Sequence, residues 1–158
     1  MKKTTPHWII IGVLSALLLA IGFKFIVLGS TAKGDDGRTA VLLEPAERQA
    51  ILGEMRGLLE TTQTIVEALA NDDLATVDKT ARSVGSAAIK TVDFKLRAKL
   101  PLDFKKLGFG THYAFDEIAD LAKAGKPVKE VQQKLAETMN NCIACHAMYQ
   151  LPVVQSHP

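Results

Sequence analysis

The sequence predicts an all-α protein, an antiparallel up-down-up-down four-helix bundle preceded by an N-terminal transmembrane or signal helix. Three observations lead to this prediction. Apolar residues recur every three or four positions from Glu44 almost to the end of the chain, which is the period of an α-helix. Short clusters of Pro, Gly, Asn and Asp divide this pattern into four segments, and such short connections are typical of up-down bundles. The first 32 residues stand apart because they contain a long apolar run.

The N-terminal segment, residues 1–32, is long enough to cross a membrane. As a helix, the run from Trp8 to Leu28 would be about 31 Å long, which matches the hydrocarbon core of a bilayer. An uncleaved anchor through residues 8–28 fits this length best, and a signal peptide cleaved near Ala32 is the alternative. Lys2 and Lys3 place the N-terminus in the cytoplasm. We therefore expect the rest of the chain on the periplasmic side of the cytoplasmic membrane, either anchored there or soluble in the periplasm after cleavage.

The remaining chain divides into a linker, one domain and a tail. Residues 33–43 contain two glycines and two aspartates, and we predict a short flexible linker there. Residues 44–151 form the predicted four-helix domain, and residues 152–158 form a tail. No strand signal is recognised in any of these segments.

Residues that start or stop helices set the limits of the first two predicted helices. The first begins at Pro45, which suits the first turn of a helix, and ends before the run Asn71-Asp72-Asp73. Asp73 can cap the next helix. The second helix spans about residues 74–99 and stops before Pro101.

The third and fourth predicted helices complete the bundle. Asp103 can cap the third, and Gly108 and Gly110 are expected to loosen its first turns. The fourth follows a Gly-Lys-Pro connection and begins at Val128. Its apolar seam continues into Cys142 and His146, so these two side chains are expected to face the bundle interior.

The last predicted helix carries the motif Cys142-Ile143-Ala144-Cys145-His146, which contains the only two cysteines of the chain. Cys-x-x-Cys-His is the attachment spacing of c-type haem. Each thiol adds across one haem vinyl group, and His146, one helical turn after Cys142, directs its imidazole towards the iron. The alternatives for such a cysteine pair are a redox dithiol, a structural disulfide and half of a zinc site. The small residues from Gly85 to Ala88 fit either close helix packing or room for a haem edge.

The charge distribution does not indicate a nucleic-acid partner. Lys2, Lys3 and Lys24 account for the net charge of +2, so the domain itself is close to neutral, and it has no basic patch. The sequence also contains no recognisable catalytic triad, paired-carboxylate site or phosphate-binding loop. We therefore expect no enzymatic turnover.

The domain resembles the cytochrome c′ family, the class II c-type cytochromes, which include low-spin relatives with a methionine ligand. The resemblance covers residues 44–151. It is carried by the position of the motif on the last helix, near the C-terminus, and by an aromatic residue, Tyr149, three positions after His146. The resemblance implies one covalent haem c held by thioethers to Cys142 and Cys145. His146 would be the proximal axial iron ligand, and Tyr149 would pack against the haem.

The resemblance also points to the residues on the distal side of the haem. In the family the distal residue often follows an arginine by four positions, and Arg48 then places Leu52 there as an apolar lid over an open, five-coordinate iron. Met55 lies three positions further on the same face and either packs in the core or acts as the distal axial ligand. His112 is expected to face solvent or to cap a loop. The family usually has a basic residue directly after the aromatic one, and this chain has Gln150 instead.

Two functions follow from this resemblance. The first is an exported monohaem cytochrome that carries single electrons between redox partner proteins of a respiratory chain. The alternative is a five-coordinate cytochrome c′ that binds NO or CO in detoxification or sensing. A third class, a membrane-anchored helical interaction module with a disulfide, needs no haem. Many relatives form dimers, so a homodimer is a further expectation.

Overall fold

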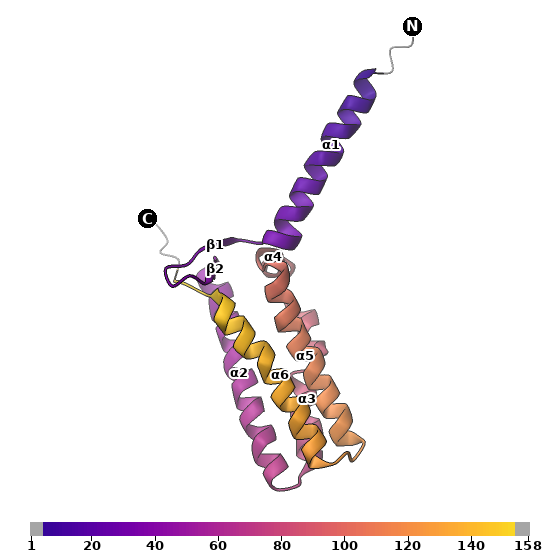
Figure 1. Cartoon of the computed structure of the whole chain (residues 1–158), viewed down its shortest axis with the longest axis vertical. Coiled ribbons are helices and arrows are strands. Elements are labelled where there is room, and N and C mark those ends of the chain that lie inside the picture. Colours follow the sequence, from indigo (N-terminus) through magenta and orange to yellow (C-terminus); the bar gives the residue numbers. More distant parts are fainter. Residues whose placement is uncertain (1–4, 154–158) are drawn as a thin grey trace.

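The computed structural model describes residues 5–153, with side chains from His7 onward. Lys2 and Lys3, which indicate the orientation of the N-terminus, and most of the tail 152–158 lie outside the described residues. The described part is mostly helical, as predicted (Figure 1). The α-helices are α1 (Thr5–Phe23), α2 (Pro45–Ala70), α3 (Leu74–Ser83), α4 (Phe94–Lys99), α5 (Leu102–Lys123) and α6 (Val128–Met148). A π-helical turn η1 (Lys24–Leu28), a 3-10 helix η2 (Ser86–Thr91) and the strands β1 (Thr31–Lys33), β2 (Thr39–Val41) and β3 (Tyr149–Gln150) complete the fold.

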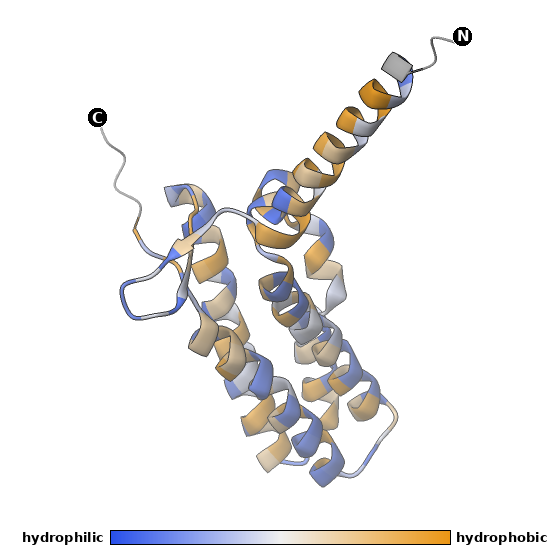
Figure 2. Ribbon diagram, turned by 45° about the horizontal axis from the view of Figure 1, so that its top comes forward, coloured by the Kyte–Doolittle hydropathy of each residue, from blue (hydrophilic) through white to orange (hydrophobic). Residues whose placement is uncertain are grey.

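Helix α1 projects away from the other helices, and its surface is predominantly apolar (Figures 1 and 2). Together with η1 it forms one stretch, His7–Leu28, that is long and apolar enough to cross a membrane, although signal sequences have the same properties. Large apolar side chains such as Trp8, Leu18 and Leu19 are more than two-thirds exposed. Such a surface is suited to a lipid environment.

The junction between this apolar stretch and the rest of the protein is tightly packed. The backbone N–H of Ser30 donates to the carbonyl of Lys99 (2.7 Å), and Lys105 Nζ donates to the carbonyl of Ile26 (2.9 Å). Gly29 has φ +64°, and a Cβ at this position would overlap the backbone of the turn between α4 and α5. The end of the apolar stretch is therefore fixed against the turn between α4 and α5.

The segment predicted as a flexible linker, residues 33–43, is ordered, so this prediction and the absence of strands were wrong. Strands β1 and β2 pair in antiparallel fashion and, with the turn between them, form a hairpin. Strand β3, from the far end of the chain, pairs with β2 in parallel. Val41 is fully buried and Leu43 is 3% exposed. The apolar residues after the polar turn therefore join the core, and the partner strand lies more than a hundred residues away, where no local pattern indicates it.

Helix α2 begins and ends where the sequence predicts. The Glu44 backbone N–H donates to the Glu47 carboxylate (2.8 Å), and the Glu44 side chain in return accepts from the Glu47 backbone, which forms a capping box before Pro45. Asp73 caps α3 as predicted, because its Oδ1 accepts from the backbone N–H of Thr76 (3.0 Å).

The single helix predicted over residues 74–99 was wrong, because the chain divides there into α3, η2 and α4. The break lies at Gly85, where a Cβ would overlap the carboxylate of Asp116 on α5. The next backbone N–H, that of Ser86, donates to Asp116 Oδ2 (2.8 Å). A contact with a distant helix thus replaces the local hydrogen bonds that would continue α3.

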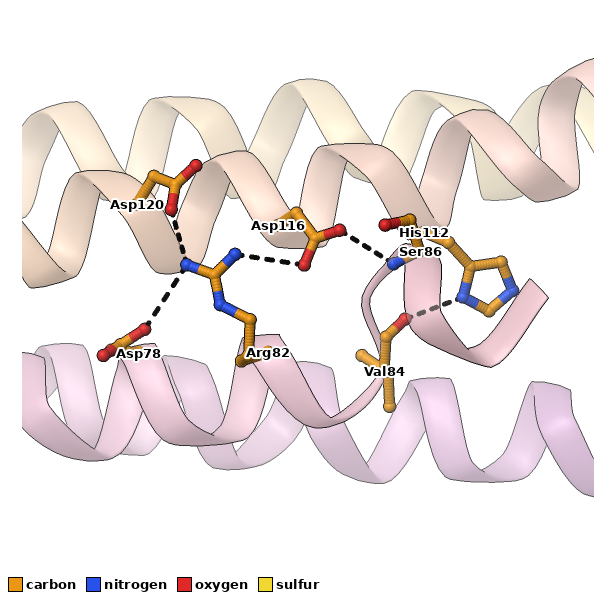
Figure 3. Close-up of polar contacts among 7 residues, drawn as sticks. All are labelled: Asp78, Arg82, Val84, Ser86, His112, Asp116 and Asp120. Atoms are coloured by element: carbon orange, nitrogen blue, oxygen red, sulfur yellow. Dashed lines mark hydrogen bonds and ion pairs between the residues drawn. The ribbon is translucent and has the colours of Figure 1, made fainter. Parts of the chain in front are cut away.

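A charged cluster holds α3 against α5 beside this break (Figure 3). Arg82 contacts Asp116 (3.2 Å), Asp120 (2.5 Å) and Asp78 (3.7 Å). Burial raises the pKa of Asp116, but the hydrogen bonds from Ser86 and the charge of Arg82 outweigh it and leave the pKa lowered. Because Arg82 is partly exposed, the network mainly fixes the position of the break.

Helix α5 is continuous through Gly108 and Gly110, so the predicted irregular first turns were wrong. Its N-cap is Pro101 rather than Asp103, whose carboxylate pairs with Lys106 (2.9 Å) instead. Two hydrophobic clusters hold the helices together. The first is shared by α2, α3, α5 and α6 and is centred on the fully buried Ile65 and Ile118.

The second cluster lies at the end of the protein where the hairpin, α4 and the base of α1 meet (Figure 1). It contains Ile51, Leu96 and Phe104, and Cys145 and Tyr149 pack against it. The C-terminal end of α6, which carries the cysteine motif, therefore lies at the same end of the protein as the apolar N-terminal stretch.

Candidate functional site

Helix α6 presents the cysteine motif at its C-terminal end. Val131 and Leu135 on its N-terminal half are buried in the first cluster. The prediction that the same seam carries Cys142 and His146 into the interior was wrong, because both are exposed. His146 and Cys145 line a cavity, and Cys145 also packs against the second hydrophobic cluster.

This cavity, which we call the motif cavity, has a volume of about 310 Å³. It brings together five of the six residues predicted to form the site: Leu52, Met55, Cys145, His146 and Tyr149. Both candidates for the distal side of a haem, Leu52 and Met55, thus face the same space as the histidine of the motif. Cys142 does not line the cavity and lies exposed one helical turn before His146.

Sequence reasoning missed Arg38, which lines the motif cavity from the hairpin. Its Nη1 donates to the backbone carbonyls of His146 and Tyr149, both at 3.2 Å, and its Nη2 pairs with Asp36 (2.6 Å). In the family that the chain resembles, position 150 usually carries a basic residue. Here the position is Gln150, whose side chain donates a hydrogen bond to Asp36 (3.1 Å). Arg38 supplies a cation close to this position from a distant segment, so no local signal identified it.

A second arginine fixes the chain that follows the motif. Arg48 Nε donates to the carbonyl of Leu151 (2.8 Å), and Leu151 also lines the motif cavity. The Tyr149 ring meets Phe104 edge to face, with centroids 5.2 Å apart and an interplanar angle of 74°. These contacts hold one wall of the cavity between α2, α5 and the hairpin.

Both cysteines are free thiols. Desolvation raises the pKa of Cys142, and burial together with the neighbouring Cys142 raises the pKa of Cys145 to about 11. Redox-active dithiols have at least one thiol of lowered pKa, which neither cysteine shows. No group of three His, Cys, Asp or Glu side chains that could hold a metal ion by itself occurs among the residues whose side chains are described. A haem iron takes only one or two protein ligands and needs no such group.

His112 is buried, at 5% exposure, so the prediction that it faces solvent was wrong. Its Nδ1 lies 2.7 Å from the carbonyl of Val84, at the end of α3, so it does fix a loop, as the alternative predicted (Figure 3). Its Nε2 lies 3.1 Å from Glu54 Oε1 on α2. The hydrogen bond to Glu54 raises the pKa of His112, against the opposing effect of burial. These partners are far apart in sequence, so burial could not be predicted from the local pattern.

Comparison with family models, curated proteins and solved structures found no match to this chain. The function must therefore be argued from the residues and the geometry of the motif cavity.

Proposed function

We propose that this protein is a membrane-anchored, monohaem c-type cytochrome of the cytochrome c′ type that carries single electrons on the periplasmic side of the cytoplasmic membrane. The observation that carries the proposal is the motif cavity. Cys145 and His146 of an attachment motif face Leu52 and Met55 of another helix across it, as a covalent haem would require.

The residues around the motif cavity fit haem c. Cys145, in the cavity, and Cys142, which is exposed one helical turn before His146, would form the two thioethers, and His146 would be the proximal axial ligand. When bound, the haem supplies a one-electron couple between ferric and ferrous iron. Leu52 and Tyr149 would shield it from water, and the charge of Arg38 at the cavity wall would stabilise negative charge there.

A four-helix bundle is the architecture we propose for the haem domain. Helices α2, α3, α5 and α6 share one hydrophobic cluster, and α3 packs on α2 and α5 while α5 packs on α6. Short connections join these helices except between α3 and α5, where η2 and α4 intervene. This arrangement supports the up-down-up-down order.

We propose that the N-terminal segment is an uncleaved anchor. Cleavage near Ala32 would cut inside β1, which pairs Thr31 with Val41 and Ala32 with Ala40. It would also remove the Ser30 N–H that bonds to Lys99. A signal peptide that is cleaved during export is not expected to contribute residues to the sheet of the mature protein.

Covalent haem attachment is tested by haem staining after denaturing electrophoresis, using protein from a host with haem-attachment machinery. The wild-type chain should retain haem, and the Cys142→Ser, Cys145→Ser double variant should not. Ile143→Ser is the matched control, because this exposed residue lies between the cysteines and has no role in attachment. A chain that carries no haem in the wild-type form would contradict the proposal.

The alternative, binding of NO or CO, is favoured by one observation: Leu52 gives the motif cavity an apolar distal wall. Optical spectra of the ferrous protein with and without CO distinguish the two functions. A high-spin spectrum that shifts with CO and is unchanged in Met55→Ala would favour gas binding. A low-spin spectrum that is lost in Met55→Ala would favour methionine ligation and electron transfer.

A further inference from the structure

A second cavity, which we call the junction cavity, lies between α2, η2, α4 and α5. Its volume is about 440 Å³, within the range of roughly 300–1,000 Å³ that is typical of sites for small organic molecules. Its walls are mostly apolar and aromatic, and they include Ile51, Leu96, Phe104 and Phe109.

The lining also contains polar side chains, namely Glu54, Thr91, Asp93, Lys105 and His112. Among them Glu54 and His112 are paired, with Glu54 Oε1 lying 3.1 Å from His112 Nε2. Both ring nitrogens of His112 have partners, Val84 O and Glu54 Oε1, so the histidine is fixed in orientation. Within residues 7–153, Oε2 of Glu54 accepts no hydrogen bond. Glu54, which is partly exposed, therefore offers a ligand in the junction cavity one carboxylate oxygen, and its other oxygen is held by His112.

The junction cavity lies next to the apolar N-terminal stretch. Leu100 and Lys105 line it, and Lys105 Nζ donates to the carbonyl of Ile26, inside the stretch that is long enough to cross a membrane. The Ser30 N–H bonds to Lys99, directly beside Leu100. In Figure 1, α4 accordingly lies at the base of α1. A molecule dissolved in the bilayer would meet this end of the protein first.

The junction cavity and the motif cavity share a wall. Phe104 lines both, and the neighbouring residues Ile51 and Leu52 of α2 face the junction cavity and the motif cavity, respectively. The Phe104 side chain therefore borders both the junction cavity and the site of the proposed haem.

We propose that the junction cavity binds the ring of a membrane hydroquinone, with one ring hydroxyl donating a hydrogen bond to Glu54. The proposal rests on the proposed cytochrome function and names the class of its electron donor. Oxidation of the hydroquinone to the quinone releases two electrons and two protons. The two electrons would leave one at a time, to the single haem of each of two protein molecules or to one haem that a redox partner reoxidises between the transfers. The two protons would pass to water.

The lining favours a hydroquinone over a lipid acyl chain. Both would bury apolar surface against Ile51, Leu96 and the two phenylalanines. Only the hydroquinone also has a hydroxyl donor for the Glu54 carboxylate, and hydrogen bonds to a charged acceptor are among the stronger ones in proteins.

Binding is measured by isothermal titration of the full-length, haem-loaded protein in lipid nanodiscs with a decyl-substituted benzohydroquinone, under anaerobic conditions with the iron reduced. No electron transfer can then occur. We expect saturable binding that is about tenfold weaker in Glu54→Gln, because a neutral amide oxygen replaces a charged acceptor. Glu60→Gln, an exposed position on the same helix, is the matched control and should bind like the wild type.

A second pair of variants tests the cavity without changing its polar residues. Ala88→Leu fills the junction cavity and should abolish binding, whereas Ala87→Leu, at an exposed position in η2, should not. Haem-loaded protein that binds no hydroquinone, that binds decanol equally well, or that is unaffected by both Glu54→Gln and Ala88→Leu would overturn this inference. Haem staining of the same samples distinguishes the two proposals. Protein that carries haem but fails these tests contradicts only the hydroquinone site, whereas protein without haem contradicts the cytochrome proposal.

Discussion

At the residue scale, the chemistry proposed here depends on contacts between segments that are far apart in sequence. The Cys-x-x-Cys-His motif is local, so the spacing of Cys142, Cys145 and His146 was sufficient to predict a haem attachment site. Leu52 was implied by the family resemblance and Met55 by its position three residues further on the same helix face, and both line the motif cavity. Arg38 was not predicted, because its contacts with the motif span more than a hundred residues.

Arg38 should raise the reduction potential of the proposed haem. Replacement by glutamine in Arg38→Gln removes a cation from the motif cavity and leaves Asp36 uncompensated, and both changes favour the oxidised, more positive iron. We expect the midpoint potential to fall by about 40 mV, equivalent to ~1 kcal/mol for one electron. Potentiometric titration measures this, with Lys129→Gln, at an exposed position near the start of α6, as the control for the change in net charge. Equal potentials in the two variants would exclude this role for Arg38.

His112 should make the stability of the domain depend on pH. Its pKa in the folded protein is raised above the ordinary value of 6.5, chiefly by the hydrogen bond to Glu54. The stabilisation is therefore fully present below about pH 6.5 and is lost as the pH rises through the folded pKa. We expect the free energy of unfolding, measured with urea, to fall over this range in the wild type.

The His112→Asn variant provides the control for this prediction, since it cannot titrate. The difference in unfolding free energy between the wild type and the variant should shrink as the pH rises. If this difference stayed constant from about pH 6 to pH 9, or grew, His112 would not be the source of the pH dependence of stability.

At the element scale, helix α2 and the start of α3 were predicted correctly from local signals, whereas the cap of α5 and the break after α3 were not. Pro45 and Asp73 mark the ends of helices in their immediate sequence, and the structure confirms both. The break at Gly85 depends on Asp116, which is 31 positions away and belongs to another helix. The pairing of β3 with β2 was missed for a similar reason, since β3 comes from the end of the chain.

The break between α3 and η2 should be sensitive to a single methyl group. In Gly85→Ala the new Cβ would overlap the Asp116 carboxylate, so the hydrogen bond to Ser86 would be distorted. We expect a loss of about 1–3 kcal/mol of unfolding free energy, as in other overpacked sites. Urea denaturation measures this.

Gly57→Ala is the matched control for the break. Gly57 lies inside α2, and a Cβ there has no other heavy atom within 4 Å. This variant should stabilise the protein by roughly 0.5–1 kcal/mol because alanine favours a helix. If Gly85→Ala were equally stabilising, the account of the break would be wrong.

At the scale of the whole molecule, the apolar stretch, the hairpin and the motif converge on one end of the protein. The sequence alone suggested a flexible linker between the anchor and the domain, because glycines and aspartates dominate residues 33–37. The structure instead joins the two through β1, Gly29 and the turn between α4 and α5. This arrangement places the motif and the junction cavity at the same end of the protein as the apolar stretch.

Two truncations should distinguish this junction from a linker. Deletion of residues 1–28 leaves β1 and Ser30 in place. Deletion of residues 1–32 removes two of the three residues of β1 and the Ser30 contacts with Lys99 and Leu42. We expect the longer deletion to melt at least roughly 5 °C below the shorter one, which corresponds to a loss of about 1 kcal/mol. Identical melting temperatures would indicate that residues 29–32 act only as a linker.

The most direct test of the central claim is the intact mass of the protein purified from the membranes of a host with haem-attachment machinery. The account predicts the mass of the whole chain, with or without its initiator methionine, plus one haem. The mass of the bare chain, or of a chain that has lost two hydrogens to a disulfide, would contradict the cytochrome proposal. A chain that begins near Lys33 and still carries haem would contradict the anchor alone.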